Sequence, residues 1–117
     1  AERYDAAFAR LGAVQVPPRP AYAGHAYQSY GLLLTPECRA GRDDLLRALI
    51  DLGISCRRGI APIHLEPLYR DRYGPTSLPV TEMVAAKSMF LPMYASLSEV
   101  DQVRIIDAVV GFLTRST

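Results

Sequence analysis

Prolines set the strongest limits on what this chain can fold into. The 117 residues include nine prolines, and three of these lie within residues 16–20. Proline lacks an amide hydrogen and clashes with the preceding helical turn, so a run of this density cannot continue a helix. We therefore predict an extended connector at residues 16–20. Further prolines interrupt residues 59–79 and leave room there for only a brief helical turn at residues 65–73.

Apolar residues recur at helical spacing in three longer stretches. The first is residues 2–11, and the second is residues 42–52, which Gly53 follows as a C-terminal cap. A third helix opens at Ser98, with Asp101 three residues later in a weak capping-box pattern. Its apolar stripe comprises Val100, Val103, Ile106, Val110 and Leu113. We also expect a shorter helix, capped by Thr81, just before residue 88.

Three segments have the aromatic and aliphatic character of strands: residues 27–34, 54–58 and 88–91. Gly31 lies inside the first and indicates either a β-bulge or a close approach of another group to the backbone. Cys56 lies inside the second, where we interpret it as a buried, inert thiol. The order of elements predicts the α+β class, with a small antiparallel or mixed sheet and helices packed on one face.

The amino-acid composition excludes several classes of protein. Half of the residues are apolar, which suits one domain with its own core and excludes a disordered segment. A formal charge of +1 predicts neither a nucleic-acid nor a membrane partner. No uncharged apolar run approaches about 18 residues, and Arg3, Asp5 and Arg10 interrupt any signal-peptide pattern. Two cysteines are too few for a disulfide framework, so we predict reduced thiols in the cytoplasm.

Motifs for common cofactors are missing from the sequence. The potential metal ligands His25, Cys38, Cys56 and His64 are scattered and lack the paired spacings of zinc sites. There is no Gly-rich phosphate loop, and no base lies near either cysteine in the sequence. We therefore predict no metal site and no catalytic residue in these 117 residues.

The residues best suited to bind a charged ligand are Arg57, Arg58 and His64. The two arginines end a predicted strand and lead into a loop shaped by glycine and proline, which carries the histidine. A guanidinium can donate two parallel hydrogen bonds to a phosphate or carboxylate. The alternative is that one arginine points into solvent, the other forms a salt bridge within the domain, and the histidine caps the loop. We predict these three as substrate-binding residues and leave that alternative open.

The order of short motifs along nearly the whole chain resembles one enzyme family. His25 precedes a Tyr-rich strand that includes Tyr30, and Arg42-Asp43 opens a helix ending in Leu52-Gly53-Ile54. Pro62 and His64 follow with Tyr69, then Leu78-Pro79 with Glu82, Leu91-Pro92-Met93-Tyr94 and Leu97-Ser98. Together these motifs resemble the C-terminal small domain of the DegT/StrS-type sugar aminotransferases, which depend on pyridoxal phosphate.

The resemblance implies a function for a longer protein. Such enzymes consist of a large cofactor-binding domain followed by the small domain, to which residues 1–117 correspond as a single unit. They transfer an amino group from glutamate or glutamine to a ketosugar, usually linked to a nucleotide, and generally work as homodimers. Their Schiff-base lysine belongs to the large domain, so Lys87, the only lysine here, does not match it. The resemblance implies that pyridoxal phosphate is bound elsewhere and that this chain alone is not an enzyme.

The chain departs from the family pattern in one place. Many members carry a His-Tyr pair after the second strand, where this sequence has Arg57-Arg58-Gly59. The family's loop borders the substrate pocket, so the difference fits a substrate with a phosphate or carboxylate group. An alternative function is a free-standing α+β module that binds a small anionic ligand or a protein partner.

Overall fold

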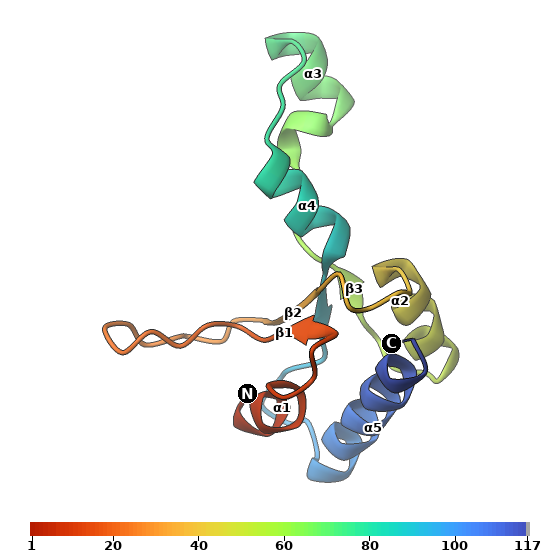
Figure 1. Cartoon of the computed structure of the whole chain (residues 1–117). Helices are drawn as coiled ribbons and strands as arrows, with labels where there is room; N and C mark the ends of the chain where they lie inside the picture. Colours follow the sequence, from red (N-terminus) through yellow and green to blue (C-terminus); the bar gives the residue numbers. More distant parts are fainter. Residues whose placement is uncertain (117) are drawn as a thin grey trace.

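In the computed structural model, which describes residues 1–116, four short strands form one open antiparallel sheet (Figure 1). The strands are β1 (Val14–Gln15), β2 (Tyr30–Leu34), β3 (Arg57–Arg58) and β4 (Ser88–Leu91), and their order in the sheet is β1-β2-β4-β3. The predicted α+β class is confirmed, and of the two predicted sheet types the antiparallel one is present. Strand β1 was not expected from the sequence because it has only two residues.

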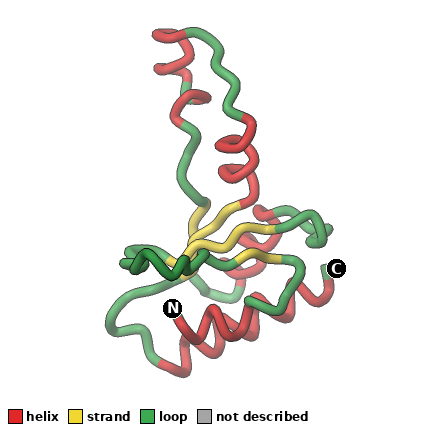
Figure 2. The backbone as a smooth tube through the Cα atoms, turned by 60° about the vertical axis from the view of Figure 1, so that its left-hand side comes forward, coloured by secondary structure: helices red, strands yellow, loops and turns green. Residues whose placement is uncertain are grey.

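Helices α1 (Glu2–Phe8), α2 (Arg42–Asp51) and α5 (Glu99–Arg115) cover one face of this sheet (Figure 2). The strands alternate in burial because successive side chains point to opposite faces. Tyr30, Leu32 and Leu34 of β2 are buried, whereas Gly31 and Leu33 between them are only half-buried. The helices therefore pack on one face of the sheet, as the sequence predicts.

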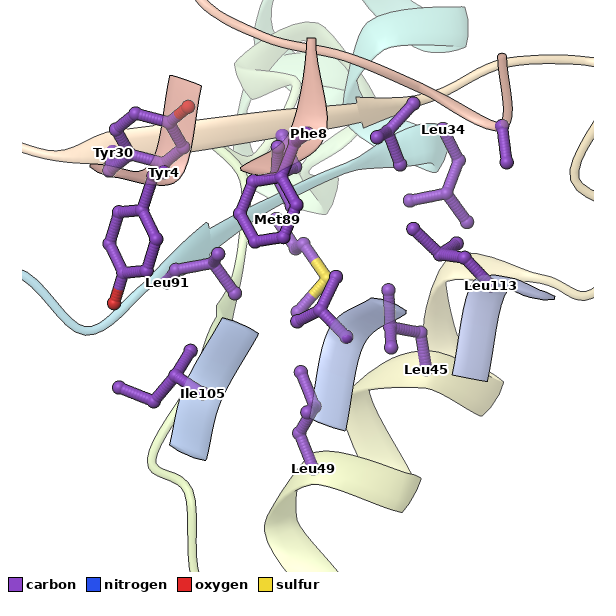
Figure 3. Close-up of a cluster of buried hydrophobic side chains, with 14 of the residues drawn as sticks. Tyr4, Phe8, Tyr30, Leu34, Leu45, Leu49, Met89, Leu91, Ile105 and Leu113 are labelled. Atoms are coloured by element: carbon purple, nitrogen blue, oxygen red, sulfur yellow. The ribbon is translucent and has the colours of Figure 1, made fainter. Parts of the chain in front are cut away.

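The core lies between that face and the three helices, and Figure 3 shows its side chains close together. Large, fully buried members come from every layer: Tyr4, Phe8, Tyr30, Leu32, Leu45, Leu49, Met89, Val109 and Leu113. The Tyr4 hydroxyl donates to the Pro92 carbonyl oxygen at 2.8 Å, which satisfies a polar group beside this apolar layer. The core thus ties both ends of the chain to the sheet.

The core-facing stripe of α5 differs from the predicted one. Ile105, Val109 and Leu113 are buried at a spacing of four residues, whereas Val100 is 78% exposed and Val103 is 47% exposed. The prediction was wrong for these two valines because apolar residues occur on more than one side of this helix. The predicted cap is confirmed, because the Ser98 hydroxyl accepts a hydrogen bond from the Asp101 N–H at 3.0 Å.

Two segments project from the sheet (Figure 1). The loop arm (residues 16–29) contains the predicted connector and extends sideways. The helical arm (residues 59–87) carries the 3-10 helix η1 (Ile63–Leu65), α3 (Pro67–Tyr73) and α4 (Pro79–Lys87). Helix α4 begins earlier than expected, with Leu78 rather than Thr81 at its N-cap, because Pro79 suits the first helical position.

Two predicted strands are shorter in the structure. Strand β2 starts at Tyr30 and not at residue 27, because Tyr27 has a φ of 48°, which an extended strand cannot contain. Strand β3 contains only Arg57 and Arg58, so Cys56 lies just before a strand and is half-buried. Burial raises the pKa of Cys56 to about 11, which agrees with an inert thiol.

Candidate functional site

The face of the sheet opposite the helices carries a row of three residues from three neighbouring strands. Gly31 of β2 and Arg57 of β3 both pair with Phe90 of β4. A Cβ atom at Gly31 would lie 3.4 Å from Cε1 of Phe90, which is an ordinary van der Waals contact, so the Phe90 ring does not require a glycine at this position. Gly31 is paired regularly within the ladder. Of its two predicted roles, the β-bulge is therefore wrong, and the close approach stays a prediction.

A hollow of about 740 Å³ lies beside this row and is mainly apolar. The loop arm contributes His25, Tyr27 and Ser29 to its wall, the sheet contributes Phe90, and the helical arm contributes Ile60 and Val84. We call this space the apolar hollow. The loop arm, the helical arm and the open face of the sheet all line the apolar hollow. The positions of the two arms relative to the sheet therefore determine the shape of the hollow.

A hydrogen-bonded network holds the base of the loop arm against α1. Asp5 accepts a hydrogen bond from the Tyr30 hydroxyl at 2.6 Å. It also forms an ion pair with Arg19, in which Nη2 and Oδ2 are 2.8 Å apart. The Tyr27 hydroxyl lies 3.5 Å from the same carboxylate and also contacts Arg19. The Tyr27 ring stacks on His25 with a centroid distance of 4.1 Å. Burial, and then the hydrogen bond to Asp5, raise the pKa of Tyr30 well above its usual range.

This network could not be predicted from the sequence. The acidic residue lies in a predicted helix 25 positions before Tyr30, and no spacing rule connects the two. The only available signal was the cluster of tyrosines that precedes the first long strand. The network orients His25 and Tyr27 toward the apolar hollow, which makes them candidate binding residues in addition to the three predicted ones.

Arg57 lies on the open face of the sheet. Its guanidinium carbon is 4.4 Å from the centroid of the Phe90 ring, and Nη2 donates to the Ser29 hydroxyl at 3.3 Å. A smaller, polar hollow of about 320 Å³ adjoins it, with Gln28 and Cys56 in its wall. The cation–π contact and the hydrogen bond hold a positively charged group at the edge of this smaller hollow.

Arg58 has a different environment although it is the next residue. Its Nε and Nη2 atoms donate to the two carboxylate oxygens of Asp43 at 3.2 and 2.9 Å. Asp43 lies in the first turn of α2 and also contacts Arg42. Hydrogen bonds from Arg42 and then Arg58 lower the pKa of Asp43. The structure therefore places Arg58 in a salt bridge within the chain.

His64 lies in the helical arm, beside a third hollow of about 470 Å³ lined by Tyr69, Tyr73 and Thr81. Its Nε2 atom is 3.0 Å from Oε1 of Glu82, and its side chain is only 11% exposed. The same oxygen accepts the Leu78 N–H at 2.8 Å. This N–H, and then the His64 ring, lower the pKa of Glu82. The three predicted residues thus line different surfaces and do not form one cluster.

Comparison with known proteins places the chain in an enzyme family. Residues 1–110 match the profile of the DegT/DnrJ/EryC1/StrS aminotransferase family, and the chain belongs to this family. Similarity to solved structures supports this assignment. The chain is similar to TlmJ, an aminotransferase from Streptoalloteichus hindustanus, with 30% sequence identity and a TM-score of 0.86.

Two further solved structures are similar over nearly the whole chain. One is a DegT DnrJ EryC1 StrS aminotransferase from Brucella abortus, at 33% identity and a TM-score of 0.78. The other is DesV from S. venezuelae, solved in complex with a ketimine intermediate, at 25% identity and a TM-score of 0.85. The matches to TlmJ, the Brucella enzyme and DesV cover 99%, 96% and 99% of this chain, but only 30%, 29% and 30% of theirs. The chain spans about three-tenths of the length of these relatives.

Aminotransferases of this family depend in general on pyridoxal phosphate. The residues described here do not fit that cofactor by themselves, because its chemistry requires a lysine amine. Lys87 is the only lysine; it is the last residue of α4 and does not line the apolar hollow.

Within residues 1–116, no helix is both long and apolar enough to cross a membrane. Over the same residues, no three His, Cys, Asp or Glu side chains lie together as metal ligands would.

Proposed function

We propose that this chain is the C-terminal small domain of a pyridoxal-phosphate-dependent sugar aminotransferase. The parent enzyme transfers an amino group from glutamate or glutamine to a ketosugar linked to a nucleotide. One observation carries the proposal: 99% of the chain aligns with 30% of TlmJ at 30% identity and a TM-score of 0.86. The family profile supports the same reaction class. The cofactor is then held by residues outside this chain.

In this proposal the domain supplies a wall of the substrate pocket. The apolar hollow and the open face of the sheet are suited to this role, because both arms leave their apolar side chains uncovered there. The parent enzyme is a homodimer in which the domain contacts its own large domain. Its location is the cytoplasm, which agrees with the two free thiols, Cys38 and Cys56.

The test is an assay of the full-length protein encoded by the reading frame that contains this chain. We expect the purified protein to bind pyridoxal phosphate and to release 2-oxoglutarate from glutamate over many turnovers only when a nucleotide-linked ketosugar is supplied. The 117-residue chain is the matched control and should give no product. A full-length protein that binds no pyridoxal phosphate would overturn the proposal and favour the free-standing binding module.

A further inference from the structure

We infer that only Arg57 of the arginine pair binds an oxyanion of the substrate, and that Arg58 is a structural residue held by Asp43. The inference rests on the proposed function and deepens it, because it assigns the specificity of the site to one side chain. The ligand group is a phosphate or a carboxylate.

The strand itself separates the two guanidinium groups. Arg57 pairs with Phe90, which lies in the same row as Gly31 on the open face of the sheet. Arg58 pairs with Met89, whose side chain is fully buried on the helix-covered face. Neighbouring residues in a strand point to opposite faces. Arg57 can therefore reach a ligand on the open face, whereas Arg58 is directed toward α2.

The hydrogen-bond donors of the two residues are used differently. A guanidinium has five N–H donors, and it binds a carboxylate through a fork of two parallel bonds. Arg58 already forms such a fork with Asp43. Within residues 1–116, Arg57 donates only one weak bond, to the Ser29 hydroxyl at 3.3 Å, and has no carboxylate partner. Arg57 therefore keeps a fork available for an incoming oxyanion.

The surroundings of Arg57 prepare it for this role. The Phe90 ring supports the plane of the guanidinium at 4.4 Å, which reduces the conformational freedom lost on binding. The Ser29 hydroxyl donates to the Gln28 side-chain oxygen at 2.7 Å, which orients the residue that contacts Arg57. Gln28, Ser29 and Phe90 line both the small polar hollow and the apolar hollow. An oxyanion at Arg57 would thus lie where the two spaces meet.

The experiment measures equilibrium binding by calorimetry on the full-length protein. Pyrophosphate represents the diphosphate of a nucleotide-linked sugar, and glutarate represents the carboxylates of the amino donor. We expect one of the two probes to bind and R57Q to weaken it by about 10- to 100-fold, because a charge-assisted fork is lost. R57K should weaken it less, because the charge remains. R47Q alters an exposed arginine on α2 and is the matched control.

R58Q separates the two roles. It should lower the melting temperature, because Asp43 loses its forked partner, and change the dissociation constant of the probe by less than twofold. The inference is overturned if wild-type protein binds neither probe, if R57Q binds as wild type does, or if R58Q weakens binding as much as R57Q does. Binding that depends on Arg57 in a protein without aminotransferase activity would retain the inference and reject the proposed function.

Discussion

At the scale of single residues, the backbone conformation of Gly53 ends helix α2. Its φ of 73° lies in the left-handed region, and its N–H bonds to the Ile50 carbonyl oxygen at 2.8 Å. The next N–H, of Ile54, bonds to the Leu49 carbonyl oxygen at 2.9 Å. These bonds satisfy carbonyl groups that the end of α2 would otherwise leave without partners. The predicted C-terminal cap at Gly53 is confirmed.

Gly53→Ala should therefore destabilise the protein by about 1 kcal/mol, because a Cβ atom is disfavoured in the left-handed region. This corresponds to a fall of about 4 °C in the melting temperature. Gly24→Ala is the control, because nothing lies within 4 Å of the added Cβ and the φ of Gly24 is not positive. Thermal unfolding measures both variants, and equal melting temperatures would contradict the role given to Gly53.

At the scale of elements, Arg42 connects α2 to α4 and β4, two consecutive elements whose bonded residues follow it by 43 and 46 positions. It begins α2, and its Nη1 atom donates to the Ala85 carbonyl oxygen in α4 at 3.0 Å and to the Ser88 carbonyl oxygen in β4 at 2.9 Å. Its side chain is only 10% exposed. The helical arm is thereby attached to the helix layer on the other side of the sheet.

Arg42→Met should cost about 3 kcal/mol of unfolding free energy, because it leaves the Ala85 and Ser88 carbonyl groups without a charged donor. Arg47→Met in the same helix is the control. Arg47 is 72% exposed and its ion pair with Asp44 spans 3.8 Å, so we expect a change below about 0.5 kcal/mol. Denaturant unfolding followed by circular dichroism measures the difference. A loss for Arg47→Met as large as that for Arg42→Met would refute this assignment.

At the scale of the whole molecule, the two arms make the chain unusually extended. Its radius of gyration is 15.5 Å, whereas a compact chain of this length has about 13 Å. The helical arm leaves many large apolar side chains exposed: Ile60, Ile63, Leu65, Leu68, Tyr69, Tyr73, Leu78, Val80, Met83 and Val84. Exposed apolar surface of this extent is typical of a region that packs against further protein.

The isolated chain should accordingly bind a hydrophobic dye and self-associate as its concentration rises. The proposed parent enzyme should show much weaker dye fluorescence per molecule, because under that proposal its large domain covers the arm. Dye titration and analytical ultracentrifugation measure the two effects. An isolated chain that stays monomeric at high concentration without binding dye would instead support the free-standing module.

Much of the candidate site was beyond sequence reasoning. The sequence predicted Arg57, Arg58 and His64 as substrate-binding residues. This role stays a prediction for Arg57 and His64, and for Arg58 we infer a structural role instead. The partners Asp43 and Glu82 lie 15 and 18 positions away from Arg58 and His64, so spacing rules could not pair them. The network of Asp5, Arg19, Tyr27 and Tyr30 was missed for the same reason.

The sequence by itself determined the α+β class, the helix of residues 42–52 with its glycine cap, the Ser98 cap and the family resemblance. These depend on proline positions, apolar periodicity and short motifs, which act over a few neighbouring residues. Only the tertiary structure decided which of the two adjacent arginines faces the open side of the sheet and that Val100 and Val103 lie outside the core. Such outcomes depend on which distant segments pack together, and local patterns carry no information about that choice.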